Sequence, residues 1–184
     1  MELPSFKYHP DPLVTGSIKR EEGKCVCCGE IRDYIYVGGL YGEDFETGDV
    51  LCPWCISNGL AHEKLGVEFN DPSSVGGYDW ALRKTVPREI KEEVAHRTPS
   101  FSSWQQEKWL VHCNDACAFL GPAGKQEILA IGSQGLIESL REDIQMNEED
   151  FTDYFESLDK EADPTAFIFR CLHCGAYLGY SDFT

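Results

Sequence analysis

The segment CVCCGE at residues 25–30 begins a series of closely spaced cysteine pairs, which continues with LCPWCIS at 51–57, CNDAC at 113–117 and CLHC at 171–174. The chain has nine cysteines, an odd number, and no export signal is recognised, so a secreted disulfide framework is not expected. Reduced thiolates two or three residues apart can face one ion from a tight turn. Two such turns complete the tetrahedral sulfur set that Zn2+ favours, so the sequence predicts two structural zinc sites.

The predicted metal ligands are the eight paired cysteines, Cys25, Cys28, Cys52, Cys55, Cys113, Cys117, Cys171 and Cys174. In the first site, 23 residues separate the two pairs, a loop short enough to fold back as one unit. Gly29 follows the first pair, where a metal-binding knuckle needs a residue that adopts positive φ. Pro53 fits the first turn of a helix that runs to Leu65 and stops at Gly66.

The second predicted site joins pairs that are 53 residues apart, and its first spacing, Cys113-x3-Cys117, is less usual. Two neighbouring imidazoles, His112 and His173, are acceptable zinc ligands and could replace a cysteine. The sequence favours His112 as an ordinary strand residue and His173 as the exposed tip of a knuckle. The grouping of the four pairs into sites stays open, as does the choice between zinc and iron, although the short first loop favours sequential pairing.

A thiol redox protein is the alternative to plain structural zinc. Cys52-Pro-Trp-Cys55 at the start of a helix resembles a dithiol oxidoreductase motif, because a helix N-terminus lowers the pKa of a thiol. Such a motif belongs in a βαβ pattern, which this region does not show. Cys27, the unpaired thiol, is interpreted first as a small buried hydrophobe, then as a redox group or an alternative ligand.

Composition narrows the class of protein. The 184 residues carry a formal net charge of −16, so a phosphate backbone would be repelled and nucleic-acid binding is disfavoured. Residues 138–163 alone hold 11 acidic and 2 basic side chains. No apolar stretch approaches the length of a membrane span, and the first residues are punctuated by prolines, so we expect a cytoplasmic protein without a membrane segment.

The pattern of residues predicts an α+β fold: a small zinc-stabilised protein with zinc-ribbon-like knuckles, short antiparallel strands and several helices. Expected strands are 30–41, its partner 49–51, and the strand–turn–strand unit around the last cysteine pair. Expected helices after the first are one that Pro87 opens and Thr98 stops, and two amphipathic ones around 136–144 and 147–158. The chain is expected to be one domain, with a zinc lobe around 21–66, a linker around 67–86 and a second zinc lobe around 100–184.

The segments FKYHPDPLVTG, CVCCG, LCPWCISNGLA, TPSFSSWQQEKWLVHCNDACAFLG and FRCLHCGAYLGYSD occur in that order and together span most of the chain. In this combination the sequence resembles the CbrC-type family of small bacterial proteins. The resemblance implies a bacterial cytoplasmic protein and an association of some members with tolerance to protein toxins, but it supplies no substrate and no catalytic residues.

The sequence shows no phosphate-binding glycine loop, no nucleophile elbow and no other catalytic constellation, so an enzyme is not predicted. The leading hypothesis is a non-enzymatic zinc-binding protein, an acidic interaction module for a basic protein partner such as a toxin domain. The second is a thiol redox or metal-responsive protein that uses Cys27 or the Cys52 and Cys55 pair. The sequence does not indicate the identity of the partner or the oligomeric state.

Overall fold

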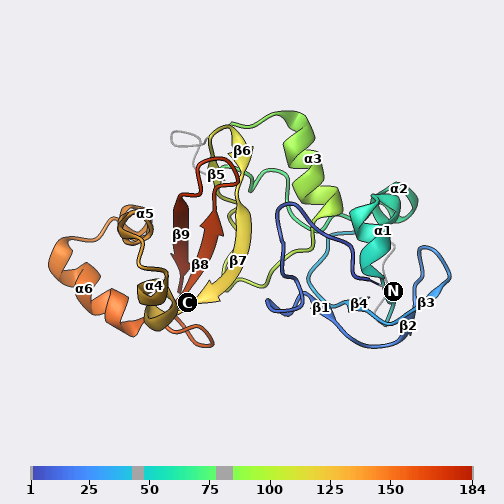
Figure 1. Cartoon of the computed structure of the whole chain (residues 1–184), viewed down its shortest axis with the longest axis horizontal. Coiled ribbons are helices and arrows are strands. Elements are labelled where there is room, and N and C mark those ends of the chain that lie inside the picture. The colour runs from blue at the N-terminus through green and yellow to red at the C-terminus, as the bar shows by residue number, and fades with distance from the viewer. Residues whose placement is uncertain (1, 43–47, 78–84, 184) are drawn as a thin grey trace.

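The computed structural model describes residues 2–42, 48–77 and 85–183, and these form a mixed α+β protein (Figure 1). The helices are α1 (Pro53–Ser57), α2 (Leu60–Leu65), α3 (Arg88–Arg97), α4 (Lys125–Ile131), α5 (Gln134–Ile144) and α6 (Glu148–Ser157). The strands are β1 (Ile18–Lys19), β2 (Gly23–Lys24), β3 (Ile31–Arg32), β4 (Ile35–Tyr36), β5 (Val111–His112), β6 (Asp115–Ala116), β7 (Ala118–Ala123), β8 (Thr165–Arg170) and β9 (Tyr177–Asp182).

A three-stranded antiparallel sheet, in the order β7-β8-β9, occupies the middle of the molecule. Strand β8 lies between the other two, and five of its six residues are buried, as expected for the central strand TAFIFR. On one side the sheet packs in an aromatic core that includes Phe101, Trp109, Phe119 and Phe169. On the other side it contacts α4, α5 and α6, shown at the left of Figure 1, through a second core.

Helix α5 lies close against strand β9. A Cβ atom on Gly179 would come 2.9 Å from a methyl group of Leu136 and 3.1 Å from one of Leu140, so the helix can approach this closely only because the strand carries glycine there. The Ser139 hydroxyl donates to the carbonyl of Gly179 at 2.7 Å and accepts from its N–H at 2.7 Å. The two predicted amphipathic helices are present, and α5 packs directly on the sheet, whereas α6 contacts α4.

The N-terminal lobe, at the right of Figure 1, contains two small antiparallel pairs, β1 with β4 and β2 with β3, beside α1 and α2. Residues 49–51 were expected to pair as a strand with residues 30–41, and this pairing is a single antiparallel bridge between Tyr36 and Leu51. The helix predicted from Pro53 to Leu65 is broken in two. Gly59 adopts a φ of 80°, which interrupts the helix, and Gly66 ends the second part as predicted.

The first residues connect the N-terminal lobe to the central core. Phe6 is buried in the core of the N-terminal lobe, whereas Tyr8 is buried in the aromatic core beside the sheet. The N–H of Phe119 in β7 donates to the carbonyl of Tyr8 at 2.7 Å. Val14, further along this arm, is 79% exposed and packs in neither core. The arm therefore holds the two halves together through two aromatic side chains.

The stretch expected to serve as a linker is packed where the structure describes it. Val67 and Phe69 lie in the core of the N-terminal lobe, and Val75 lies in the aromatic core. Residues 78–84, in the second half of the expected linker, are outside the described residues. The division into two lobes and a linker remains a prediction. Within the described ranges, no helix combines the length and the apolar character that crossing a bilayer requires.

Candidate metal centres

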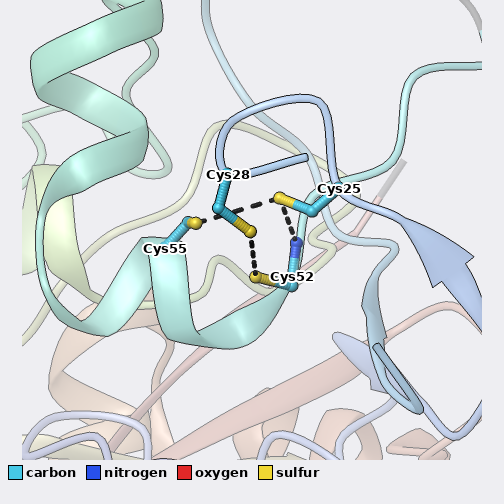
Figure 2. Close-up of side chains that lie close together, drawn as sticks. All are labelled: Cys25, Cys28, Cys52 and Cys55. Carbon is cyan, nitrogen blue, oxygen red and sulfur yellow. Dashed lines mark hydrogen bonds between the residues drawn. The ribbon is translucent and has the colours of Figure 1, made fainter. Parts of the chain in front are cut away.

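The first candidate centre is formed by Cys25, Cys28, Cys52 and Cys55, whose sulfur atoms all lie within 4.8 Å of one another. Figure 2 shows the four side chains converging from two segments, a loop between β2 and β3 and the start of α1. The sulfurs of Cys25 and Cys55 are 3.8 Å apart, and those of Cys28 and Cys52 are 3.9 Å apart. None of the four is in a disulfide, so all four sulfurs could bind one ion.

Local turn chemistry places the first two thiols. Gly29 has a φ of 76° and donates its N–H to the carbonyl of Cys25 at 2.7 Å, while the N–H of Cys25 donates to the carbonyl of Glu30 at 2.9 Å. These bonds close a knuckle that turns both side chains inward. On the other segment, Cys52 is the N-cap of α1 and Pro53 occupies its first turn, as the sequence predicts.

In the first candidate centre, the contacts of Cys25 favour the thiolate form of its side chain. A hydrogen bond from the Cys52 thiol lowers the pKa of Cys25 to about 4, although burial acts in the opposite direction. Backbone N–H groups of the knuckle lower this pKa further, and the N–H of Cys52 lies 3.3 Å from the Cys25 sulfur. The same bond and burial raise the pKa of the Cys52 thiol. A cation in the middle of the group would replace this shared proton.

The second candidate centre consists of His112, Cys113, Cys171 and Cys174, whose ligand atoms also lie within 4.8 Å of one another. The hairpin β5–β6 supplies the first two residues, and the turn between β8 and β9 supplies the others. Nδ1 of His112 is 3.2 Å from the sulfur of Cys113 and 3.4 Å from that of Cys174. Cys113 and Cys174 are exposed, whereas Cys171 is buried, so this centre lies open to solvent on one side.

The turn that carries Cys171 and Cys174 repeats the first knuckle bond for bond. Gly175, with a φ of 74°, donates to the carbonyl of Cys171 at 3.1 Å, and the N–H of Cys171 donates to the carbonyl of Ala176 at 2.8 Å. Burial would raise the pKa of Cys171, but backbone N–H groups of Cys174 and His173, and the His112 side chain, lower it to about 6. The strand–turn–strand unit predicted at this end of the chain is therefore present.

The structure places Cys117, predicted as the fourth ligand of the second site, outside that group, and His112 stands in its position. Cys113 and Asn114 both have positive φ, 51° and 57°, and form the two-residue turn of the hairpin. Neighbouring side chains alternate only on a continuous strand, and at this turn His112 lies beside Cys113, so the interpretation of His112 as an ordinary strand residue is corrected. Cys117 lies beyond the hairpin and is fully buried in the aromatic core.

The other histidine and the ninth cysteine stand beside the two centres. His173 is bonded through Nε2 to Asp115 at 2.9 Å and belongs to neither group of candidate ligands within the described residues. Cys27 is buried in the knuckle of the first centre, and burial raises the pKa of its thiol. Its position as a small buried side chain agrees with the first interpretation of its role.

Sequence reasoning left one feature of these sites open and missed another. The choice of His112 as a candidate ligand could have been favoured from Asn114, because asparagine is a frequent residue at positive φ in two-residue hairpin turns. A third group of candidate ligands, His62, Glu68 and His96, comes from three separate segments without motif spacing. No local pattern in the sequence marks it.

The comparisons with known proteins agree on one family. The model of an uncharacterised protein family, UPF0167, matches residues 3–183. UPF0167 proteins of Mycobacterium bovis and Mycobacterium tuberculosis are each 40% identical to the chain over 185 residues, covering 99% of it and 94% of their own length. One from Pseudomonas aeruginosa is 39% identical over 182 residues, covering 99% of this chain and 98% of its own. No solved structure matches the chain.

Proposed function

The chain belongs to the uncharacterised protein family UPF0167, and for this member we propose the function of a zinc-binding interaction protein. Two zinc ions, one in each candidate cysteine centre, would stabilise the fold, and the acidic helical face would bind a basic protein. The sequence predicted an uncharacterised bacterial family, and membership of UPF0167 agrees with that prediction. The CbrC-type name and a cytoplasmic location are parts of the proposal.

The arrangement of the ligand atoms supports zinc. Four sulfurs held about 2.3 Å from a Zn2+ ion lie about 3.8 Å from one another in a regular tetrahedron. The distances of 3.8 Å and 3.9 Å in the first centre fit that figure. A zinc-bound nitrogen and sulfur lie about 3.5 Å apart, close to the distances that His112 makes in the second centre. Tetrahedral sulfur sites also accept iron, so measuring both metals in the purified protein tests the choice.

The acidic helices support the interaction. Every acidic side chain between residues 138 and 163 is exposed except Asp143, and most of them lie on α5, α6 and the loop that follows. The N-terminal turn of α6 alone carries Glu148, Glu149 and Asp150. A surface of one charge sign raises the association rate of an oppositely charged protein and repels nucleic acid. The CbrC-type resemblance, in which some members are associated with tolerance to protein toxins, supports a toxin domain as one such basic partner.

The test is binding of the full, metal-loaded chain to cationic proteins at increasing salt. We expect capture that weakens steeply with ionic strength and is reduced in a triple variant of α6, Glu148→Gln, Glu149→Gln and Asp153→Asn. The matched control removes the same charge from the other lobe, through Glu21→Gln, Glu22→Gln and Glu30→Gln, all exposed positions. Capture that is insensitive to salt, or equal in the two triple variants, would contradict the proposal.

A second candidate, a metal-responsive or redox-responsive protein, is favoured by the exposure of Cys113 and Cys174. Exposed thiolates exchange metal and react with oxidants more readily than buried ones. The sequence pointed instead to Cys27, Cys52 and Cys55, but these are buried in the first centre. Oxidant titration of the metal-loaded chain would release ions only from the second centre if this candidate is correct. Retention of all metal until the protein unfolds would exclude it.

A further inference from the structure

A third group of candidate ligands lies apart from the cysteine centres. One ligand atom each from His62, Glu68 and His96 lie within 4.8 Å of one another, and all three residues are half-buried. His62 is in α2, His96 is near the end of α3, and Glu68 is in the segment that joins Gly66 to the rest of the chain. The group therefore lies at the junction of the N-terminal lobe and α3.

Backbone hydrogen bonds hold the three residues in register. The N–H of Phe69, next to Glu68, donates to the carbonyl of Ala95, next to His96, at 2.7 Å. Glu68 also exchanges two backbone bonds with Tyr41, of 2.7 Å and 2.8 Å. The positioning of the carboxylate beside α3 thus depends on main-chain contacts, independently of any attraction between the side chains.

His62 presents a nitrogen in the form that binds metals. Nδ1 of His62 lies 3.0 Å from the carbonyl of Val67, which can only accept, so Nδ1 carries the proton and Nε2 keeps its lone pair. A ring nitrogen fixed in this way by a backbone carbonyl is the usual second contact of a metal-binding histidine. Nε2 of His96 lies 3.2 Å from Oε1 of Glu68 and donates its proton to that carboxylate, so a cation between the two groups would displace this proton.

The two imidazoles stack, with ring centroids 3.5 Å apart and planes 6° from parallel. Both nitrogens can face one ion after one ring turns about its side-chain bonds. The side chain of His96 is 21% exposed, so its ring is not fully enclosed by the surrounding residues. The Glu68 side chain is 35% exposed, so an ion can enter from solvent while the group remains partly desolvated.

We propose that His62, Glu68 and His96 form a third metal site, which takes a divalent transition metal such as Zn2+. Two imidazoles and one carboxylate suit borderline ions, in contrast to the thiolates of the other centres. Three protein ligands leave a position for water or a small anion, as in exchangeable and catalytic sites. The site uses none of the cysteines, so its metal binding can be tested separately from that of the proposed structural zinc sites.

The experiment measures metal per chain by elemental mass spectrometry after equilibration of the full protein with buffered free Zn2+. At low free Zn2+ the sulfur centres are occupied, and raising it adds one further equivalent to the wild type. In His96→Gln and in Glu68→Gln, the affinity for that equivalent falls roughly tenfold or more. The control Glu93→Gln removes a carboxylate one turn away on α3, which pairs with Arg97, and keeps the equivalent.

The folded state is checked by far-UV circular dichroism and by the tightly bound metal, both unchanged in a variant that folds. Glu68→Gln alone decides the result if His96→Gln does not fold. NMR of 15N-labelled histidine locates the ion through shifts of the His62 and His96 ring nitrogens on addition of Zn2+. The absence of a further equivalent in the wild type, its retention in both variants, or shifts confined to other histidines would overturn the proposal.

Discussion

Nε2 of His173 donates to the carboxylate of Asp115 at 2.9 Å, across 58 residues of sequence. The same carboxylate accepts from the Tyr8 hydroxyl at 2.6 Å and from the ammonium of Lys7 at 3.0 Å. One buried acid therefore joins the knuckle of the second centre, the hairpin beside it and the N-terminal arm. The three donors outweigh burial and keep the pKa of Asp115 below its ordinary value.

Asp115→Asn is expected to destabilise the protein by about 2–3 kcal/mol, because an amide removes the charge and meets the same donors with an N–H group. This loss of stability is at the lower end of the range for breaking a buried ion pair, because the Lys7 side chain is half exposed. Urea unfolding of the metal-loaded protein measures it. Asp153→Asn, an exposed acid on α6, should stay within about 0.5 kcal/mol of the wild type. Equal midpoints for the two variants would show that the Asp115 contacts contribute nothing.

Cys113→Ser is expected to reduce the tightly bound metal from two ions per chain to one, whereas Cys117→Ala keeps both. The reason is that Cys113 belongs to the second centre and Cys117 to the aromatic core. Replacing Cys117 should cost about 1 kcal/mol of stability through lost packing. Elemental analysis at low free Zn2+, with a melting curve for each variant, separates the two roles. A lost ion in Cys117→Ala would restore the assignment made from the sequence.

The two centres are expected to differ in reactivity. An alkylating reagent, added to the metal-loaded protein with a chelator, should label Cys113 and Cys174 before Cys25 and Cys52, because the former are exposed and the latter buried. Peptide mass spectrometry over time gives the order. Simultaneous labelling of both groups would contradict this.

Complete removal of metal is expected to abolish cooperative melting, because structural zinc contributes about 10–16 kcal/mol per site in finger peptides. An unchanged transition in metal-free protein would contradict this expectation.

His9 is expected to make the fold sensitive to acid. Burial lowers its pKa from 6.5 to about 4, against a smaller opposing effect of the Pro99 carbonyl. Between these values the unfolded chain binds the proton and the folded protein does not. Stability from the neutral ring is therefore complete above pH 6.5 and declines as the pH falls toward 4, by up to about 1.4 kcal/mol per unit.

The variant His9→Gln tests this slope, since its amide can replace the bonds of 2.8 Å to the Pro99 carbonyl and 2.6 Å to the Thr15 hydroxyl. The stability difference between wild type and variant, from urea unfolding at pH 7 and pH 5, should move by about 2 kcal/mol in favour of the variant. Acid release of metal affects both proteins and cancels in the difference. A difference that does not change with pH would exclude a buried neutral His9.

The knuckle glycines are expected to be intolerant of a side chain. Gly175→Ala forces alanine to a φ of 74° and should cost about 1 kcal/mol, with weaker metal binding at the second centre. Gly135, inside α5, has no close neighbour for a Cβ other than the Ser133 hydroxyl at 3.9 Å. Gly135→Ala should therefore stabilise by about 0.5–1 kcal/mol. Thermal melting of both variants measures these opposite signs, and the same sign in both would refute the argument.

Much of the fold could be predicted because its signals are local. The helix that begins after Pro87, the pair of helices before the last strands, and both knuckles with their glycines follow from patterns within a few residues. The break of the first helix at Gly59 was not predicted, although glycine is a weak helix former. Helix α4 was also missed, in a region where the sequence pattern gave no expectation.

The candidate sites divide in the same way. Paired cysteines with two residues between them identify six of the group members, because the turn that joins each pair is short, and the longer Cys113-x3-Cys117 spacing identifies Cys113 as the seventh. His112 replaces Cys117 because Cys113 and Asn114 adopt positive φ, a conformation that strand alternation does not anticipate. The group of His62, Glu68 and His96 is assembled by tertiary contacts between α2 and α3. Such contacts leave no periodic trace in a single sequence.

The N-terminal arm has a consequence for synthesis of the protein on the ribosome. Tyr8 emerges early, but Asp115, which binds its hydroxyl, follows 107 residues later. Tyr8 therefore stays undocked, and accessible to chaperones, until residues 115–119 have been synthesised. Attachment of the N-terminal lobe to the central core thus follows the synthesis of the first cysteine group.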